Sequence, residues 1–191
     1  MKNKVNQIIN EVFDLYEKHG GDDYIGEPVS QLEHMSQSAQ LAIKQGCDDE
    51  VVLAAFFHDI GHSCVKQNAS NSMDGYGVKS HEKVGADYLR EKGFPERVAK
   101  LVESHVQAKR YLTFKNPEYY NSLSDASRKT LEFQGGKMNQ EEADAFESDR
   151  IFDTSILMRK WDELAKEVDV PIIDLNAMKE RARKALQGIL K

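Results

Sequence analysis

The chain has 191 residues, of which 30% are charged, and a formal net charge of −6 at pH 7. This length predicts a single domain with a substantial hydrophobic core. Because the charge balance is acidic and no run rich in Lys and Arg occurs, we expect no binding to nucleic acid or to an anionic membrane surface.

The cysteines and the first residues predict where the protein works. Cys47 and Cys64 are the only cysteines and do not form a CxxC motif, so we expect reduced thiols rather than a disulfide framework. Residues 1–14 contain no continuous apolar segment, which predicts neither a signal peptide nor a membrane span. These features predict a cytoplasmic protein.

In chain order, apolar residues at helical spacing predict a first helix over residues 5–16, ended by Gly20 and Gly21. Residues 22–28 have the composition of a loop. A second helix is expected from about Pro28 to Gly46, and it carries His34 close to its apolar face. The inward positions of this helix are Val29, Leu32, Met35, Ala39, Ala42 and Ile43.

The next helix is the most apolar stretch of the chain. Asp48 is its expected N-cap, and residues 53–57 run as a buried segment directly into His58, Asp59 and, four residues after His58, His62. Residues 63–79 are rich in Asn, Ser and Gly and predict a long loop, a kind of segment that is often functional.

Helical patterns also account for the second half of the chain. Ser80 is expected to cap a helix that begins at His81 and ends at Gly93, and Pro95 begins a helix that carries His105. The break at residues 116–117 precedes a polar helix from Ser124 to residues 135–136. Asn139 and Glu142 have the spacing of a capping box, and the helix that follows them extends to Asp162. A last helix begins near residue 174. No segment alternates like a strand, so the predicted class is all-α.

The polar residues near the apolar faces suggest a metal site. A carboxylate and imidazoles are costly to bury unless something pairs with them, and a metal ion is the usual partner. The alternative for any single residue is a core histidine satisfied by a neighbouring side chain. Four imidazoles and two carboxylates without thiolates suit a pair of first-row metals, with Asp59 able to bridge them. The candidate ligands are His34, His58, Asp59, His81, His105 and Asp162.

The order His…His-Asp…His…His…Asp resembles that of the HD-domain superfamily, metal-dependent helical proteins that are mostly phosphohydrolases. The chain is also similar to the oxygenase branch related to myo-inositol oxygenase, and in particular to the PhnZ-type enzymes. The most specific parts of this likeness are residues 24–27 (Tyr-Ile-Gly-Glu), residues 31–34 and residues 58–62. The resemblance implies one HD-domain helical bundle over residues 1–191, with a metal-binding core at about 24–165 and the terminal helices packed on it.

The PhnZ-type enzymes cleave 2-amino-1-hydroxyethylphosphonate to glycine and phosphate, with dioxygen as co-substrate, at a mixed-valence centre of two iron ions (Fe2+/Fe3+). The resemblance implies that the substrate chelates the ion held by His34, His58, Asp59 and Asp162, and that dioxygen binds at the ion held by Asp59, His81 and His105. It also implies that Tyr24 ligates the resting centre until substrate displaces it, and that Glu27 accepts the substrate's ammonium group.

Two basic residues lie one helical turn from candidate ligands: Lys109 follows His105 by four residues, and Arg159 precedes Asp162 by three. Both could bind a phosphonate, with Ser127 and Thr130 as hydroxyl donors unless these two simply face solvent. At the position of His62 many relatives in the superfamily have a lysine, and an imidazole could donate to the same anion.

Three functions remain open at this point. The preferred one is the phosphonate dioxygenase, an enzyme acting on a small molecule as a monomer or small homo-oligomer. A dinuclear HD-domain phosphohydrolase is the alternative, and a helical regulator stabilised by metal is the third. The loop with Tyr24 and Glu27 favours the oxygenase, because hydrolysis needs an open position for water. The ligand set alone does not distinguish iron from manganese, zinc or cobalt, and the methylation state of the substrate's amine stays open.

Overall fold

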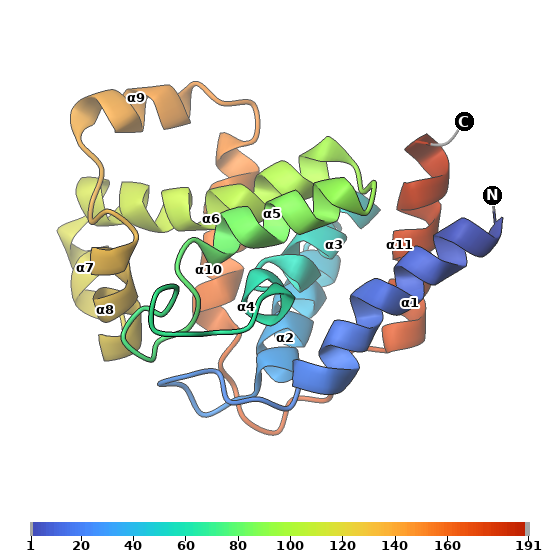
Figure 1. Ribbon diagram of the computed structural model, residues 1–191. Coiled ribbons are helices and arrows are strands. Elements are labelled where there is room, and N and C mark those ends of the chain that lie inside the picture. Colours follow the sequence, from blue (N-terminus) through green and yellow to red (C-terminus); the bar gives the residue numbers. More distant parts are fainter. Residues whose placement is uncertain (1, 190–191) are drawn as a thin grey trace.

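A computed structural model describes residues 2–189 (Figure 1). Within this range the protein is all-α, as predicted, and the only strand-like pairings are two isolated bridges, Asp23 with Ser30 and Ser72 with Val78. None of the helices in the described residues has both the length and the apolar content to cross a membrane. Residues 2–189 form eleven helices: α1 (Lys2–His19), α2 (Gln31–Lys44), α3 (Asp49–Phe57), α4 (Gly61–Cys64), α5 (His81–Glu91), α6 (Glu96–Lys115), α7 (Pro117–Ser122), α8 (Asp125–Phe133), α9 (Gln140–Glu147), α10 (Phe152–Leu164) and α11 (Leu175–Ile189).

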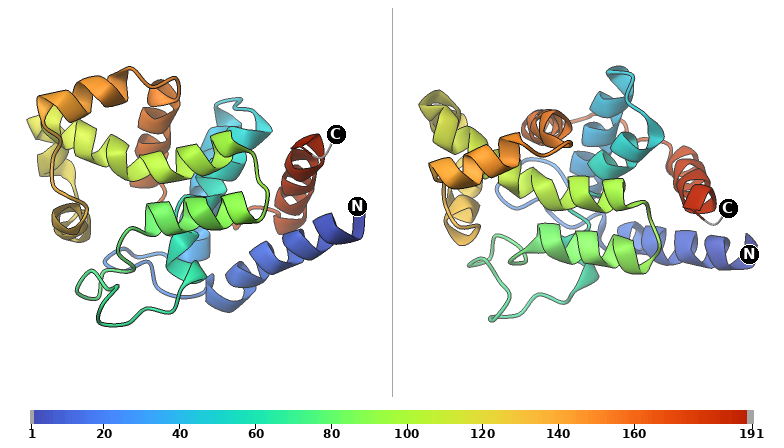
Figure 2. Two further views of the ribbon diagram at one scale, coloured as in Figure 1. Left: turned by 45° about the horizontal axis from the view of Figure 1, so that its top comes forward. Right: turned by 90° about the horizontal axis from the view of Figure 1, so that it is seen from above.

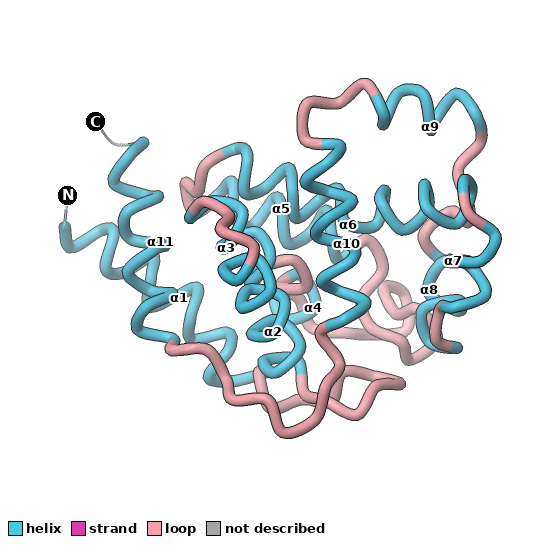
Figure 3. Tube along the Cα trace, turned by 180° about the vertical axis from the view of Figure 1, so that it is seen from behind, coloured by secondary structure: helices cyan, strands magenta, loops and turns pink. Residues whose placement is uncertain are grey.

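A central bundle of α2, α3, α5, α6 and α10 forms the middle of the molecule (Figures 1 and 3). Helices α1 and α11 pack against each other at one end, and α7, α8 and α9 lie at the other end. The long loop between α4 and α5 projects toward the end that carries α7 and α8 (Figure 2). Besides contacting each other, α11 packs on α3, and α1 packs on α2 and α4.

Helix α3 is the centre of the hydrophobic core because it is apolar on every side. All residues from Val51 to Phe57 are buried. The rings of Phe56 and Phe57 contact Phe13 and Tyr16 of α1, and Phe57 also meets Phe94 edge-on. Burying an aromatic side chain contributes on the order of 1.5–3 kcal/mol, so this cluster attaches α1 firmly to the bundle.

Several predicted helix caps are confirmed. The side chain of Asp48 accepts hydrogen bonds from the backbone of Glu50 and Val51 at the start of α3. Ser124 caps α8 in the same way, and Asn139 with Glu142 forms a complete capping box at the start of α9. These side chains satisfy donors that a helix start otherwise leaves unpaired.

The second helix starts later than predicted. Helix α2 begins at Gln31 rather than at Pro28, because Ser30 and Glu33 form a capping box at its start. Pro28 lies in the preceding loop. Ile43, predicted to face inward, is 39% exposed near the last turn of α2.

Two other boundaries also differ from the prediction. Ser80 precedes α5 but adopts the left-handed conformation (φ 54°) and makes no side-chain cap. The chain turns at Ser80 as it passes from the long loop into α5. This left-handed turn is incompatible with the extended backbone conformation of an N-cap residue. Residues 140–162 form two helices rather than one, because the chain turns at residues 148–151 between α9 and α10.

Candidate metal centre and adjoining cavity

The six candidate ligands converge at the centre of the bundle from separate elements, and all six side chains are buried. His34 comes from α2, His81 is the first residue of α5, His105 lies in α6 and Asp162 lies in α10. His58 and Asp59 lie just beyond the end of α3 rather than within it, in the turn that leads to α4. The chain folds tightly there because Gly61 lies against the backbone of α5, where an added Cβ would be 1.9 Å from the carbonyl oxygen of His81.

Asp59 lies between two pairs of histidines, and each of its carboxylate oxygens faces one pair. Oδ2 is 3.6 Å from Nε2 of His34 and 3.4 Å from Nε2 of His58. Oδ1 is 3.2 Å from Nε2 of His81 and 3.5 Å from Nε2 of His105. In this arrangement Asp59 could be shared by two metal ions, one held by each pair of histidines.

Asp162 joins only the first of these two groups. Its Oδ1 is 3.3 Å from Nε2 of His34 and 3.9 Å from Nε2 of His58. One group therefore contains two histidines and two carboxylates, and the other contains two histidines and the shared Asp59. The described residues thus offer a dinuclear site with unequal halves.

The hydrogen bonds of the imidazoles test whether this site fits metal ions. Nδ1–H of His34 donates to the carbonyl of Ala165, and those of His58 and His105 donate to the carbonyls of Ala55 and Val102. These bonds place the lone pair of each neutral ring on Nε2. The Nε2 atoms of His34 and His58 are nevertheless only 3.0 Å apart, and those of His81 and His105 are 3.1 Å apart. Each close pair of nitrogens needs a cation between them, either a shared proton or a metal ion. Imidazoles held through Nδ1 with their Nε2 atoms converging in this way fit metal ligation.

The charges of the two carboxylates dominate the electrostatics of the cluster. Burial lowers the pKa of His58, but Asp59 and Asp162 outweigh it and raise this pKa to about 9. Burial and the neighbouring His81 lower the pKa of His105 to about 3. Burial alone would raise the pKa of both aspartates. The imidazoles of His58 and His81 instead hold the pKa of Asp59 well below its usual range. Arg159, together with the imidazoles of His34 and His58, does the same for the pKa of Asp162. Both carboxylates are therefore ionised.

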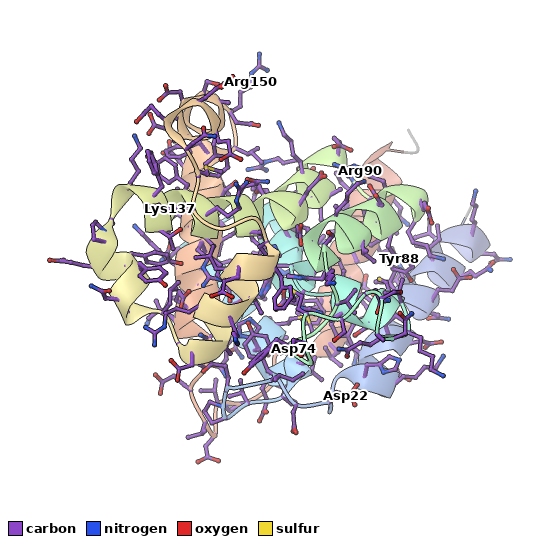
Figure 4. All side chains as sticks on the ribbon, turned by 60° about the vertical axis from the view of Figure 1, so that its left-hand side comes forward. Asp22, Asp74, Tyr88, Arg90, Lys137 and Arg150 are labelled. Carbon is purple, nitrogen blue, oxygen red and sulfur yellow. The ribbon has the colours of Figure 1, made fainter. Side chains whose placement is uncertain are left out.

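A cavity of about 180 Å³ opens onto this cluster. Its floor includes Asp59, His81, His105 and Asp162, and its walls come from the loops before α2 and before α5 together with α6, α8 and α10. Figure 4 labels Asp22 and Asp74, which mark the two loops and lie on the same side of the molecule. A small polar molecule in this cavity would reach the candidate ligands directly.

Four of the five residues predicted to bind an anion are brought together on one wall of this cavity. Nζ of Lys109 donates to Oγ1 of Thr130 at 2.8 Å, and Arg159 donates from Nη2 to Oγ of Ser127 at 3.1 Å. Lys109 and Arg159 are both buried. Burial, and secondly the charge of Arg159, lower the pKa of Lys109 well below its usual range. An anion placed between Lys109 and Arg159 would favour the charged form of Lys109 and would accept charge-assisted hydrogen bonds from both side chains.

His62 lies beside the second pair of histidines as a neutral imidazole. Its ring stacks on that of His81, with centroids 4.1 Å apart, and its Nδ1 accepts a hydrogen bond from the backbone N–H of Val78. Burial and the neighbouring His81 lower its pKa to about 3. Because Nδ1 already accepts the N–H of Val78, the neutral ring carries its hydrogen on Nε2, which is left as the donor. Gly77 makes room for this ring, because a Cβ there would lie 2.5 Å from Cε1 of His62.

Tyr24 and Glu27 lie in one turn of the loop before α2, in which the backbone N–H of Glu27 donates to the carbonyl of Tyr24. The ring of Tyr24 stacks on the ring of His34 with centroids 4.0 Å apart. Burial, and secondly the charge of Asp162, raise the pKa of the Tyr24 phenol. Glu27 lines the cavity and forms an ion pair with Lys166.

Four residues of this region were missed in the sequence. Gln134 accepts from Lys109, the Tyr119 hydroxyl accepts from Nε of Arg159, and Lys166 pairs with Glu27. Oε2 of Glu82 lies 3.6 Å from Nδ1 of His81, and neither of these two atoms has a hydrogen-bond partner among the described residues. Spacing was the available signal, since Gln134 follows Thr130 by four residues and Lys166 follows Asp162 by four.

Comparison with known proteins shows the family of this chain. Residues 32–151 match the HD domain model, which leaves Asp162 and the loop with Tyr24 outside the match. The chain is 38% identical over 167 residues to the [1-hydroxy-2-(trimethylamino)ethyl]phosphonate dioxygenase (glycine-betaine-forming) of Leisingera caerulea, covering 87% of this chain and 84% of the relative. It is 35% identical over 179 residues to the hydroxymethylphosphonate dioxygenase of Gimesia maris, covering 94% and 88%. It is also 47% identical over 163 residues to an uncharacterized protein of Acanthamoeba polyphaga mimivirus, covering 85% and 74%.

Proposed function

The chain belongs to the HD-domain family, and within it we propose that the protein is a phosphonate dioxygenase that cleaves the carbon–phosphorus bond of a 2-amino-1-hydroxyethylphosphonate-type substrate. The observation that carries this proposal is the cavity that joins the carboxylate-bridged histidine pairs to a wall with Lys109 and Arg159. The two similar phosphonate dioxygenases support the same class of reaction.

The proposed reaction is balanced with dioxygen as the only co-reactant. The carbon–phosphorus bond breaks, C1 becomes the carboxyl group of glycine, and phosphorus leaves as inorganic phosphate. The two oxygen atoms of dioxygen supply the oxygen that the products hold beyond that of the substrate. A hydrolase cannot perform this reaction, because C1 is oxidised.

Two iron ions are the proposed cofactor. One would be held by His34, His58, Asp59 and Asp162, and the other by Asp59, His81 and His105. When bound, they would supply the redox chemistry that dioxygen activation requires. The protein's own contribution is to orient the imidazoles through their Nδ1–H bonds to backbone carbonyls.

The remaining residues would bind and orient the substrate. Lys109 and Arg159 would hold the phosphonate by charge-assisted hydrogen bonds, and the hydroxyls of Ser127 and Thr130 and the Nε2–H of His62 would complete its contacts. Glu27, which also lines the cavity, would receive the ammonium group. Tyr24 would close the centre in the resting protein and be displaced by a substrate that engages Glu27.

Product analysis under air and under argon tests the proposal. The iron-loaded protein is incubated with 2-amino-1-hydroxyethylphosphonate, its N-trimethyl analogue and hydroxymethylphosphonate, and phosphate, glycine and oxygen uptake are measured. We expect one phosphate and one glycine per dioxygen from the first substrate, and no product under argon. Phosphate release that continues under argon, or release from a phosphate monoester instead, would favour the dinuclear phosphohydrolase.

A further inference from the structure

The carboxylate proposed to receive the substrate's ammonium group already has a cationic partner within the chain. Nζ of Lys166 lies 2.8 Å from Oε1 of Glu27, and the two side chains are only 18% and 12% exposed. Both residues line the cavity. An ion pair with so little exposure is screened much less by water than a surface pair, so its charges act strongly on a charged ligand that enters the cavity.

The cations of the cavity differ in how they are paired. Arg159 binds Asp162 and Glu163, whereas Lys109 has the neutral partners Thr130 and Gln134. Lys166 is paired with Glu27, and more distantly, at 3.6 Å, with Glu163. Lys109 is thus available for an incoming anion, while Glu27 is neutralised before any substrate arrives.

The ion pair also connects the Tyr24 turn to the segment that follows α10. Lys166 comes directly after Ala165, whose carbonyl accepts the Nδ1–H of His34, and Tyr24 stacks on the same His34 ring. On its other side the turn lies against α8, since a Cβ on Gly26 (φ 86°) would be 2.6 Å from Cβ of Ala126. Loss of the Glu27–Lys166 contact therefore removes a side-chain bond that holds this turn over His34.

We infer that Lys166 is a specificity-determining residue that competes with the substrate's cationic group for Glu27. A phosphonate with an ammonium group in reach of Glu27 replaces Lys166 there, because two cations on one covered carboxylate repel each other. The released Lys166 no longer holds the Tyr24 turn. A phosphonate without a cationic group leaves the ion pair in place. The inference rests on the proposed function for the identity of the substrate.

Direct binding measured without dioxygen tests this inference. Dissociation constants for 2-amino-1-hydroxyethylphosphonate and hydroxymethylphosphonate are determined by calorimetry under argon, on the iron-loaded protein and on Lys166→Met, which keeps the length of the side chain without its charge. We expect the preference for the cationic ligand over the neutral one to rise roughly tenfold in Lys166→Met, since Glu27 loses its internal partner.

Two further variants serve as controls. Lys160→Met removes an exposed lysine of the same helical region, and its ligand preference should equal that of the parent. In Glu27→Gln the preference should be lost, and adding Lys166→Met should then have no effect. Lys166→Gln, which can still donate to Glu27 without a charge, provides a second test if Lys166→Met folds poorly, and a rise of several-fold is expected.

An unchanged preference in Lys166→Met would overturn the inference. So would an equal weakening of both ligands, which would make Lys166 a phosphonate contact instead. These outcomes are distinct from failure of the proposed function. That failure would appear as absence of turnover under air in a protein whose ligand preference still responds to Lys166.

Discussion

At the scale of single residues, Asp59 and its neighbour His58 show how adjacent side chains serve different parts of one site. Both lie in the turn after α3, yet the carboxylate of Asp59 extends between the two histidine pairs while His58 belongs to only one. The turn depends on Gly61, because any side chain there would collide with the backbone of α5. A buried dinuclear site is therefore tied to one position that has to lack a side chain.

Lys109 is the residue that best tests the proposed phosphonate contacts, because its side-chain partners Thr130 and Gln134 are neutral and neither is a candidate metal ligand. Lys109→Ala should retain the metal content and raise KM for a phosphonate roughly ten- to a hundredfold, since a charge-assisted hydrogen bond contributes on the order of 1.5–3 kcal/mol. Lys115→Ala, which removes an exposed lysine of the same helix, should leave KM unchanged. Steady-state kinetics with metal analysis measure both effects. Loss of metal in Lys109→Ala would mean that the residue supports the ligands rather than the substrate.

Arg159 calls for a different expectation, because it binds Asp162 as well as Ser127. Removing it would release a candidate ligand together with an anion contact, so a change in metal content is expected along with the rise in KM. For this reason Lys109 and not Arg159 isolates substrate binding.

Tyr24 can be tested by its optical spectrum. The ring lies on His34, and the surrounding burial and carboxylates favour the neutral phenol, so a phenolate would form only with a metal ion as partner. We expect a visible charge-transfer band in the resting diferric protein that fades when substrate is added under argon and is missing in Tyr24→Phe. A resting protein without the band, or a band that persists at saturating substrate, contradicts the proposal.

At the scale of elements, side-chain caps mark where several helices begin, and the cap of α3 is of interest because this helix leads into the site. Asp48 accepts from two backbone donors of its first turn and also binds Arg97. The side chain is exposed, so its ion pair contributes little, and capping accounts for most of its effect.

Substitutions at Asp48 separate these two contributions. Asp48→Ala should lower the free energy of unfolding by about 1 kcal/mol, whereas Asp48→Asn, which keeps a capping acceptor, should lower it by a few tenths. Urea unfolding at pH 7 measures the difference. Equal losses in the two variants would show that the bond to Arg97 matters more than the cap.

At the scale of the whole molecule, the candidate ligands join α2, α5, α6 and α10 to the turn after α3. Metal ions bound there would cross-link most of the central bundle, and the two terminal helices would not be involved. Ligands that bind only the folded state raise its stability by mass action.

Chelation should therefore destabilise the protein. At free metal concentrations about a hundredfold above Kd, bound metal contributes about 2.7 kcal/mol, so removing it should lower Tm by roughly 5–10 °C. Calorimetric unfolding with and without chelator measures this shift, and added Fe2+ should reverse it. His81→Ala, which affects ligands of only one ion, should keep one metal per chain and show a smaller shift. An unchanged Tm on chelation would show that the bundle does not depend on metal.

Much of the molecule could be read from local sequence. The helical class, the buried helix before His58, the caps at Asp48, Ser124 and Asn139, and the six candidate ligands follow from periodicity, capping chemistry and the types of polar residue near apolar faces, all of which act over a few residues. The start of α2 after Ser30 was also readable, since Ser30 and Glu33 have the spacing of a capping box, although the predicted start was Pro28. The left-handed conformation of Ser80 was not readable, because it depends on how the long loop enters α5.

Only the tertiary structure decided which oxygen of Asp59 faces which histidines, that His62 is neutral, and that Lys166 forms an ion pair with Glu27. These facts involve residues far apart in the chain, such as Glu27 and Lys166, whose contact depends on the packing of several helices. Local sequence specifies the elements and their polar residues, but distances and charge pairing between elements arise only when the core brings them together.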